Sequence, residues 1–188
     1  MNITNDRNRM SFLKEIAPQL AAVFPMSKQE LADWLEERGF FTAPASTKYH
    51  GACEGGLYAH AFTVARQLVL LTERNGLEWQ REESPWLIGF FHDLCKIDQY
   101  KFVRNDEYGS PIYAWRSDSL LRGHGEKSVM LLATLTRLTE EEVACIRYHM
   151  GAFTDKELWN DYTRAIHTYP NVLWTHTADM IASHIFDT

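Results

Sequence analysis

Hydrophobic positions recur at helical spacing over most of the chain. Leu31, Trp34 and Leu35 lie three and four residues apart, as on the buried face of an amphipathic helix. Ser27 and Glu30, just before them, have the spacing of a capping box, in which each side chain binds a free backbone amide. The pattern predicts a helix that begins directly after Ser27.

The same signals predict helices before and after this one. An earlier helix, bent or broken at Pro18, would contain Phe12, Ile16, Leu20 and Val23. Further helices are expected over residues 57–72, from 84 through the pair 92–93, and over 126–135, 139–150, 156–169 and 172–185.

Residues at the ends of these segments support the boundaries. Gly76 is a typical stop for the helix over 57–72, and Ser84 with Pro85 is typical of an N-cap and first helical position. Thr139 precedes three glutamates, whose carboxylates favour the positive end of a helix dipole. A mainly α-helical fold follows, with His92 and Asp93 well inside the helix that starts at Ser84.

One stretch departs from helical spacing. Residues 100–104 and 112–116 are β-prone and partly alternate, and residues 105–111 between them have loop chemistry. The expected fold is therefore an all-α bundle with a small β-hairpin inserted at residues 100–116. The hairpin would lie near the pair 92–93, as a lid, as a wall facing a substrate, or as a solvated structural element.

Two adjacent metal-capable side chains interrupt an apolar run. His92 and Asp93 follow Phe90 and Phe91 and precede Leu94. Burial of ionisable groups is costly unless a partner neutralises them, and a divalent metal can coordinate both. The pair is therefore a candidate metal site.

Four more metal-capable groups lie in separate predicted helices or at their ends. In chain order the set is His60, His92, Asp93, His124, His149 and Asp179. Imidazole and carboxylate together hold first-row divalent metals without a thiolate.

The motifs around these residues resemble those of the HD superfamily of metal-dependent phosphohydrolases, over about residues 49–186. The matching segments are Gly-Gly-Leu-x-x-His at 55–60, His-Asp-Leu-x-Lys at 92–96, Gly-His-Gly-Glu-Lys-Ser at 123–128 and Ala-Asp-Met-Ile-Ala at 178–182. The two histidines between Asp93 and Asp179 resemble the branch of the superfamily that binds two metals.

The resemblance implies a ligand set for each of two divalent ions, of which iron, manganese, nickel, zinc and magnesium are all candidates. One ion would be held by His60, His92, Asp93 and Asp179, and the second by Asp93, His124 and His149. Asp93 would bridge them, and a metal-activated water would attack phosphorus in line.

Three cations could assist this reaction. Lys96 follows the His-Asp pair at the spacing of the family motif, so it is expected to contact a phosphate or the attacking water and is grouped with Asp93 as catalytic. Lys127 and Arg147 are candidates for substrate binding. For all three cations the alternative is a surface charge or a structural ion pair.

Other residues near these motifs have weaker arguments. His50 could reach the pocket from a loop, and His176, three residues before Asp179, could support a ligand from outside the coordination sphere. Cys95 could supply a thiol ligand or pack in the core. His167 and His184 have no spacing that connects them to the site.

Composition bounds the function without identifying it. A chain of 188 residues that is 45% hydrophobic suits one domain, here an N-terminal helical segment at 1–48 and a metal-binding core at 49–186. The net charge of -6 argues against stable nucleic-acid binding. Three cysteines without Cys-x-x-Cys spacing and an N-terminus without an apolar signal core predict a cytoplasmic location, and no apolar run suits a membrane span.

The expected substrate is a small phosphorylated molecule such as a nucleotide. The segment at 149–153 lacks the Gly-Tyr-Pro continuation of cyclic-dinucleotide phosphodiesterases. The pattern around His60 is also similar to certain 3′-5′ exoribonucleases, but no OB-like nucleic-acid module accompanies it. Two alternatives stay open, because di-iron oxygenases use the same ligand order and because an HD module can bind a nucleotide without turnover.

Overall fold

Eight α-helices and one β-hairpin form most of the regular structure in residues 2–121 and 123–188, the part of the chain that the computed structural model describes. The helices are α1 (Ile3–Ser11), α2 (Lys28–Glu37), α3 (Gly56–Asn75), α4 (Ser84–Phe91), α5 (His124–Ala133), α6 (Glu140–Tyr148), α7 (Trp159–Thr168) and α8 (Asn171–His184). The hairpin consists of β1 (Tyr100–Asn105) and β2 (Pro111–Trp115). The prediction of a mainly helical fold with a small hairpin is confirmed.

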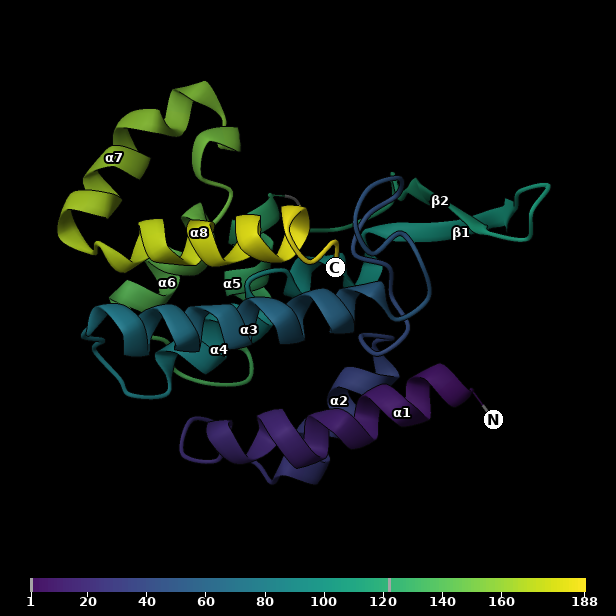
Figure 1. Ribbon diagram of the computed structural model, residues 1–188, viewed down its shortest axis with the longest axis horizontal. Coiled ribbons are helices and arrows are strands. Elements are labelled where there is room, and N and C mark those ends of the chain that lie inside the picture. The colour runs from purple at the N-terminus through teal and green to yellow at the C-terminus, as the bar shows by residue number, and fades with distance from the viewer. Residues whose placement is uncertain (1, 122) are drawn as a thin grey trace.

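The helices form layers that share one hydrophobic core. Figure 1 shows α1 and α2 on one side of α3 and α4, with α5, α6 and α8 on the other side. Phe12 and Phe40 from the N-terminal segment contact Phe90 of α4, with ring centroids 5.4 and 5.2 Å apart. All three rings are completely buried, so the N-terminal helices form part of the support beneath the helix that leads to His92.

Several predicted boundaries match the structure. Ser27 and Thr139 each form a complete capping box, with Glu30 and Glu142 respectively. Gly76 ends α3 in the left-handed conformation, at φ +61°, which a residue without Cβ adopts at little cost. Around Pro18 the N-terminal helix changes type, with π-helical turns over Phe12–Ile16 and a 3-10 turn over Ala17–Leu20.

The prediction for the His-Asp pair was wrong in one respect. Helix α4 ends at Phe91, His92 is its C-terminal cap, and Asp93 has left helical geometry at φ -102° and ψ 20°. The chain then continues as a short 3-10 helix over Leu94–Asp98. His124 is likewise the first residue of α5, where a position just before the helix was expected.

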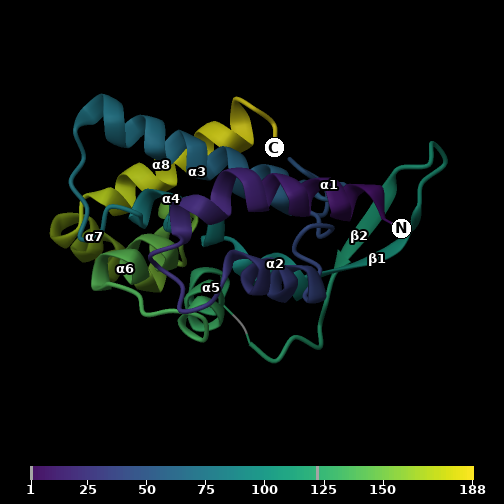
Figure 2. The ribbon, with the colours of Figure 1, turned by 90° about the horizontal axis from the view of Figure 1, so that it is seen from below.

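The hairpin extends away from the helices, with only its base near them (Figures 1 and 2). Tyr100 pairs with Trp115 at the base, and the rings meet edge to face with centroids 5.0 Å apart. Tyr108 at the opposite end is 85% exposed. The base can therefore form part of a wall near the predicted site, whereas the tip extends into solvent and does not lie over the site as a lid would.

None of the helices in the described part of the chain combines the length and the hydrophobicity that crossing a lipid bilayer requires.

Candidate metal centre

The six predicted ligands come together where five segments of the chain meet. The side chains are supplied by α3, the turn after α4, the first residue of α5, the C-terminal end of α6, and α8. They are His60, His92, Asp93, His124, His149 and Asp179. His60, His92 and His149 are fully buried and Asp93 is 2% exposed, so the centre of the cluster is shielded from water.

Asp93 lies between two groups of side chains, and each of its carboxylate oxygens faces one group. Oδ2 lies 3.5 Å from His60 Nε2 and 3.4 Å from His92 Nε2. Oδ1 lies 2.7 Å from His124 Nε2 and 3.5 Å from His149 Nε2. Asp179 joins the first group, because its Oδ1 lies 3.2 Å from His60 Nε2. This division corresponds to the two ligand sets that the resemblance implies.

Helix ends orient two of the histidine rings. His92 Nδ1 lies 2.9 Å from the carbonyl of Gly89, and His149 Nδ1 lies 2.7 Å from that of Ile146. Both carbonyls belong to the last turn of a helix, where backbone oxygens lack intrahelical partners. Each Nδ1–H therefore donates to a carbonyl, which leaves the lone pair of Nε2 directed at the cluster.

His60 is oriented in the same way from further along the chain. Its Nδ1 lies 2.8 Å from a main-chain oxygen of Thr188. Three of the four imidazoles thus present Nε2 to the cluster while Nδ1 is bound to a main-chain oxygen, which fixes the orientation of the ring as metal binding by histidine requires.

The turn at Asp93 explains how two consecutive residues serve one site. Successive side chains of an α-helix point about 100° apart, so a continuous helix would direct His92 and Asp93 to different faces. Because Asp93 leaves the helix, His92 Nε2 and Asp93 Oδ2 approach to 3.4 Å. The break in α4 is therefore the local feature that builds the site.

Two polar atoms at the centre have no hydrogen-bond partner among the described residues. They are Asp93 Oδ1 and His149 Nε2, both buried; His124 Nε2 lies within ion-pair distance of Oδ1, at 2.7 Å, but makes no hydrogen bond to it. Unpartnered buried polar atoms are rare, because each loses its hydration without compensation. Two donors on one ion with bonds of about 2.0–2.1 Å lie roughly 3–3.5 Å apart, which matches the 3.2–3.5 Å between most neighbouring ligand atoms here. The buried groups could therefore hold a metal ion.

Charges around the cluster keep its carboxylates ionised. Lys96 Nζ lies 2.6 Å from Asp93 Oδ2, and both side chains are buried. Burial opposes the charge of Asp93, but the ammonium of Lys96 and the histidines hold its pKa well below the usual range. Burial likewise opposes protonation of His60, yet Asp179 and Asp93 raise its pKa to about 9. Metal binding at neutral pH would therefore release a proton from His60.

His92 and His124 are better prepared as neutral ligands. Burial is the main cause that lowers the pKa of each below its ordinary value. At neutral pH both rings are uncharged, as coordination requires.

Cys95 contacts the site through His124. Its Sγ lies 3.5 Å from His124 Nδ1, and its own amide donates to Ser128 Oγ at 3.0 Å. Burial raises the pKa of the Cys95 thiol to about 12, and Asp93 adds to this effect. The thiol is therefore protonated at neutral pH in the metal-free protein, and it would have to lose that proton to bind a metal. Its Sγ nevertheless lies close enough to Asp93 and His124 for the three side chains to hold an ion together.

The remaining candidate cations lie further from the cluster. Lys127 is buried and contacts Asp98 and Ser119, and Arg147 Nε lies 3.3 Å from Glu126 Oε1. Each thus makes an ion pair of the structural kind that was the alternative for it.

Two histidines outside the ligand set reach the cluster. His50 lies against His60 with ring centroids 5.0 Å apart, and burial lowers its pKa to about 4, with smaller effects of His60 and Lys96. His176 Nδ1 lies 2.8 Å from the carbonyl of His149, so it contacts the backbone of a predicted ligand.

A cavity of about 410 Å³ opens over the cluster. Asp93, Lys96 and His124 lie in its wall, and so do His184 and Tyr100, which the sequence did not connect to the site. His184 is five residues after Asp179 on α8, a spacing with no signal of its own. Tyr100 is the first residue of the hairpin that the sequence predicted near the site, so the prediction could have included it. In the structure it pairs with Trp115 at the base of the hairpin.

No protein-family model, curated protein or solved structure matches this chain.

Proposed function

We propose that this protein is a metal-dependent phosphohydrolase of the HD type that acts on a nucleotide or another small phosphoester. The observation that carries the proposal is Asp93, a buried carboxylate with each oxygen facing a different group of ligands. The buried Oδ1 of that carboxylate makes no hydrogen bond among the described residues, which suits an oxygen that coordinates a cation.

The ligand sets follow from this division. His60, His92, Asp93 and Asp179 would hold one divalent ion, and Asp93, His124 and His149 the other. When bound, such ions acidify water toward neutral pH and stabilise the charge that develops on phosphoryl oxygens.

The chain itself supplies binding and positioning. The ammonium of Lys96 lies in the cavity wall beside Asp93 Oδ2, where it fixes that oxygen and offers further N–H donors to an anionic group. His50, His176 and His184 also line this cavity, so donors outnumber the two carboxylates. A phosphoryl group suits such a lining better than a neutral substrate does.

The buried position of the cluster favours the same reaction. Electrostatic interactions are stronger where water is excluded, so donors held around the cavity act on a phosphoryl group without first reorganising. The carbonyl contacts of His92 and His149 keep these rings in place before any substrate binds.

The test combines metal analysis with a screen for activity. Anaerobically purified protein would be analysed for metals, reconstituted with each candidate ion, and assayed for phosphate release from nucleotides and small phosphoesters. About two ions per chain together with phosphate release is the expected result. Two irons with substrate-dependent O₂ uptake and no phosphate release would refute hydrolysis in favour of oxygenase chemistry.

A matched pair of variants connects the result to the site. Asp93→Ala should lose both ions and all turnover, because it removes the ligand shared by the two sets. Glu37→Ala removes an exposed carboxylate on α2, 76% accessible and 3.9 Å from Arg38, and should retain both ions and turnover. Retention of two ions per chain by Asp93→Ala would exclude the bridging role.

A further inference from the structure

A second cavity, of about 440 Å³, adjoins the one over the ligands. Trp115 and His124 line both cavities, so one molecule can occupy both at once. Ligand pockets have volumes of about 300–1,000 Å³, which leaves room here for a substituent beyond the phosphoryl group.

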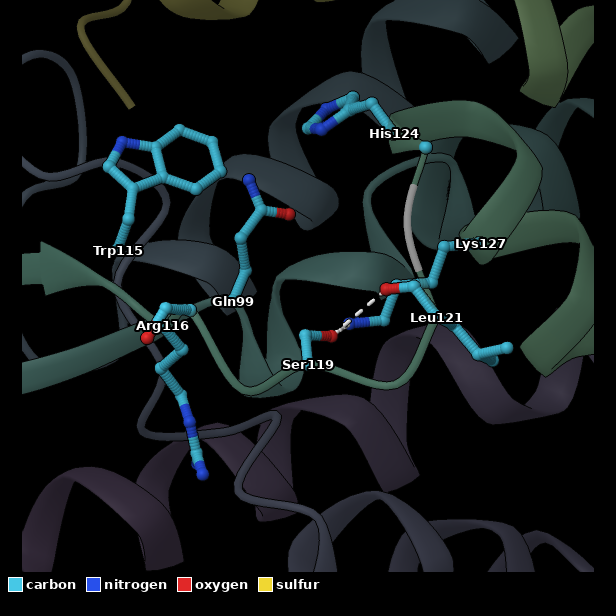
Figure 3. A pocket seen from close by; sticks show the side chains of 9 residues that line it. Gln99, Trp115, Arg116, Ser119, Leu121, His124 and Lys127 are labelled. Atoms are coloured by element: carbon cyan, nitrogen blue, oxygen red, sulfur yellow. Dashed lines mark hydrogen bonds between the residues drawn. The ribbon is translucent and has the colours of Figure 1, made fainter.

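The wall of this cavity presents an aromatic ring and an amide. Figure 3 shows the Trp115 indole and the His124 ring on either side of the Gln99 amide, and the three groups point toward the same space. The indole is 62% exposed, although it belongs to the base of the hairpin. A large exposed aromatic ring beside a buried polar site is a typical stacking surface.

Contacts at the base of the hairpin orient these groups. The Trp115 ring meets Tyr100 edge to face, and the amide of Arg116 donates to the carbonyl of Gln99 at 2.9 Å, which extends the strand pairing by one step. Gln99 Nε2 donates to the Tyr100 hydroxyl at 3.3 Å. A preorganised ring and amide lose little conformational freedom when a ligand binds.

The charges of the wall select against a second anionic group. Lys127 contacts Asp98 and Ser119, and Figure 3 shows its ammonium next to the Ser119 hydroxyl. Arg116 points away from Trp115 and pairs with Asp118, with Nη2 and Oδ2 3.0 Å apart. Because a carboxylate neutralises each cation, the cavity suits an uncharged planar group with a polar edge.

We propose that this second cavity binds the base of a nucleoside monophosphate, stacked on Trp115 with its polar edge at the Gln99 amide, while the phosphate lies at the ligand cluster. The assignment of the phosphate rests on the proposed function, and the position of the base rests on Trp115 and Gln99. An amide side chain offers both a donor and an acceptor, which is how glutamine binds the edge of a nucleobase.

The first experiment measures the contribution of the base to turnover. Nucleoside monophosphates would be compared with ribose 5-phosphate, which has the sugar and the phosphoester but no base. Trp115→Ala should lower kcat/KM for the nucleotide by about tenfold, which corresponds to about 1.4 kcal/mol, mainly through KM. The value for ribose 5-phosphate should fall much less, because Trp115 also lines the cavity over the ligands but has no base to stack on in that substrate. Trp115→Phe should recover most of the loss for the nucleotide.

The second experiment measures binding without turnover. Saturation-transfer NMR with metal-loaded protein and nucleosides, which carry no phosphoester, should show contact to the base protons that Trp115→Ala abolishes. Tyr108→Ala, at the exposed tip of the same hairpin, is the matched control and should change neither measurement. Gln99→Ala should weaken the same contact and tests the cavity independently if Trp115→Ala fails to fold.

The two measurements separate this proposal from the proposed function. Nucleoside binding that depends on Trp115, with no phosphate release from any ester, would support the base site and refute the hydrolase. Equal turnover of both esters, unaffected by Trp115→Ala or Gln99→Ala, would refute the base site and leave the hydrolase intact. Absence of nucleoside contact in the wild-type protein would also refute the base site.

Discussion

Removal of Asp93 should have two effects that a second substitution can separate. Asp93 is both the predicted shared ligand and the partner of Lys96, whose Nζ lies 2.6 Å from Oδ2. Lys96 is only 7% exposed, so Asp93→Ala leaves a buried ammonium without its counter-ion. Removal of one partner from a buried pair costs about 3–5 kcal/mol. For a domain of this size that corresponds to a fall in Tm of roughly 6–20 °C.

The assay is thermal unfolding of protein treated with a chelator, so that metal binding does not contribute. Asp93→Ala should unfold well below the wild type, and Asp93→Ala/Lys96→Met should recover much of the difference, because an apolar side chain then replaces the unpaired charge. Neither variant should bind metal. Asp118→Ala breaks an exposed pair, worth at most about 1 kcal/mol, and serves as the control.

The dependence on pH provides a further check. In the wild type, burial opposes the charge of Lys96, but Asp93 raises its pKa above the ordinary value. The contribution of the pair therefore persists through neutral pH and is lost only as pH rises beyond the usual lysine range. Without Asp93, burial alone lowers this pKa, so the unfolded chain binds more protons and stability rises with pH. The deficit of Asp93→Ala should shrink between pH 7 and 10. A deficit that does not depend on pH, or a double variant no more stable than Asp93→Ala, would refute this reasoning.

Three further substitutions test single contacts. Lys96→Ala should leave the metal content unchanged and reduce turnover, as metal analysis and kinetics would show. Loss of metal from this variant would contradict the assignment of Lys96 as a group that assists the reaction. Gly89→Ala should lower Tm by several degrees in thermal unfolding, because the added Cβ would lie 2.4 Å from the Cα of Ala65. An unchanged Tm would mean that α3 and α4 can move apart at no cost in stability. Thr139→Ala should cost about 1 kcal/mol in denaturant unfolding through loss of the capping box with Glu142, and a difference below about 0.3 kcal/mol would mean that the cap is not needed.

The sequence predicted helices well where their ends carry chemistry of their own. Ser27, Gly76 and Thr139 act through hydrogen bonds or a backbone conformation within a few residues, so local pattern was sufficient. The end of α4 has no such signal, because apolar residues continue from Phe91 past the His-Asp pair to Leu94. Contacts from distant segments surround this turn, including those of His60 and His149 with Asp93. A local sequence pattern carries no information about contacts between distant segments, so the end of α4 could not be predicted from it.

The candidate site shows the same limit. Motif spacing identified side chains that the structure brings within a few ångströms of Asp93, because the motifs lie on segments that meet at this residue. Spacing could not show how the rings are oriented, because this depends on main-chain oxygens such as those of Gly89 and Thr188. Spacing also could not show that the Trp115 ring is exposed, because tryptophan side chains are more often buried in a core.

Stability and function make opposite demands on the residues around Asp93. Without a cation, Lys96 and a protonated His60 offset the charges of Asp93 and Asp179. Metal binding would displace the proton of His60, and its affinity should therefore rise with pH until that group has titrated. Lys96 differs from His60, because its pKa is raised above the ordinary lysine value and it therefore keeps its charge beside Asp93 when a metal binds. A fixed positive charge beside a metal cluster weakens metal binding by repulsion. A lysine at this position is therefore explained if the same charge contacts an anionic substrate. Lys96→Met should accordingly tighten metal binding while it weakens phosphate binding, a combination that a purely structural lysine would not produce.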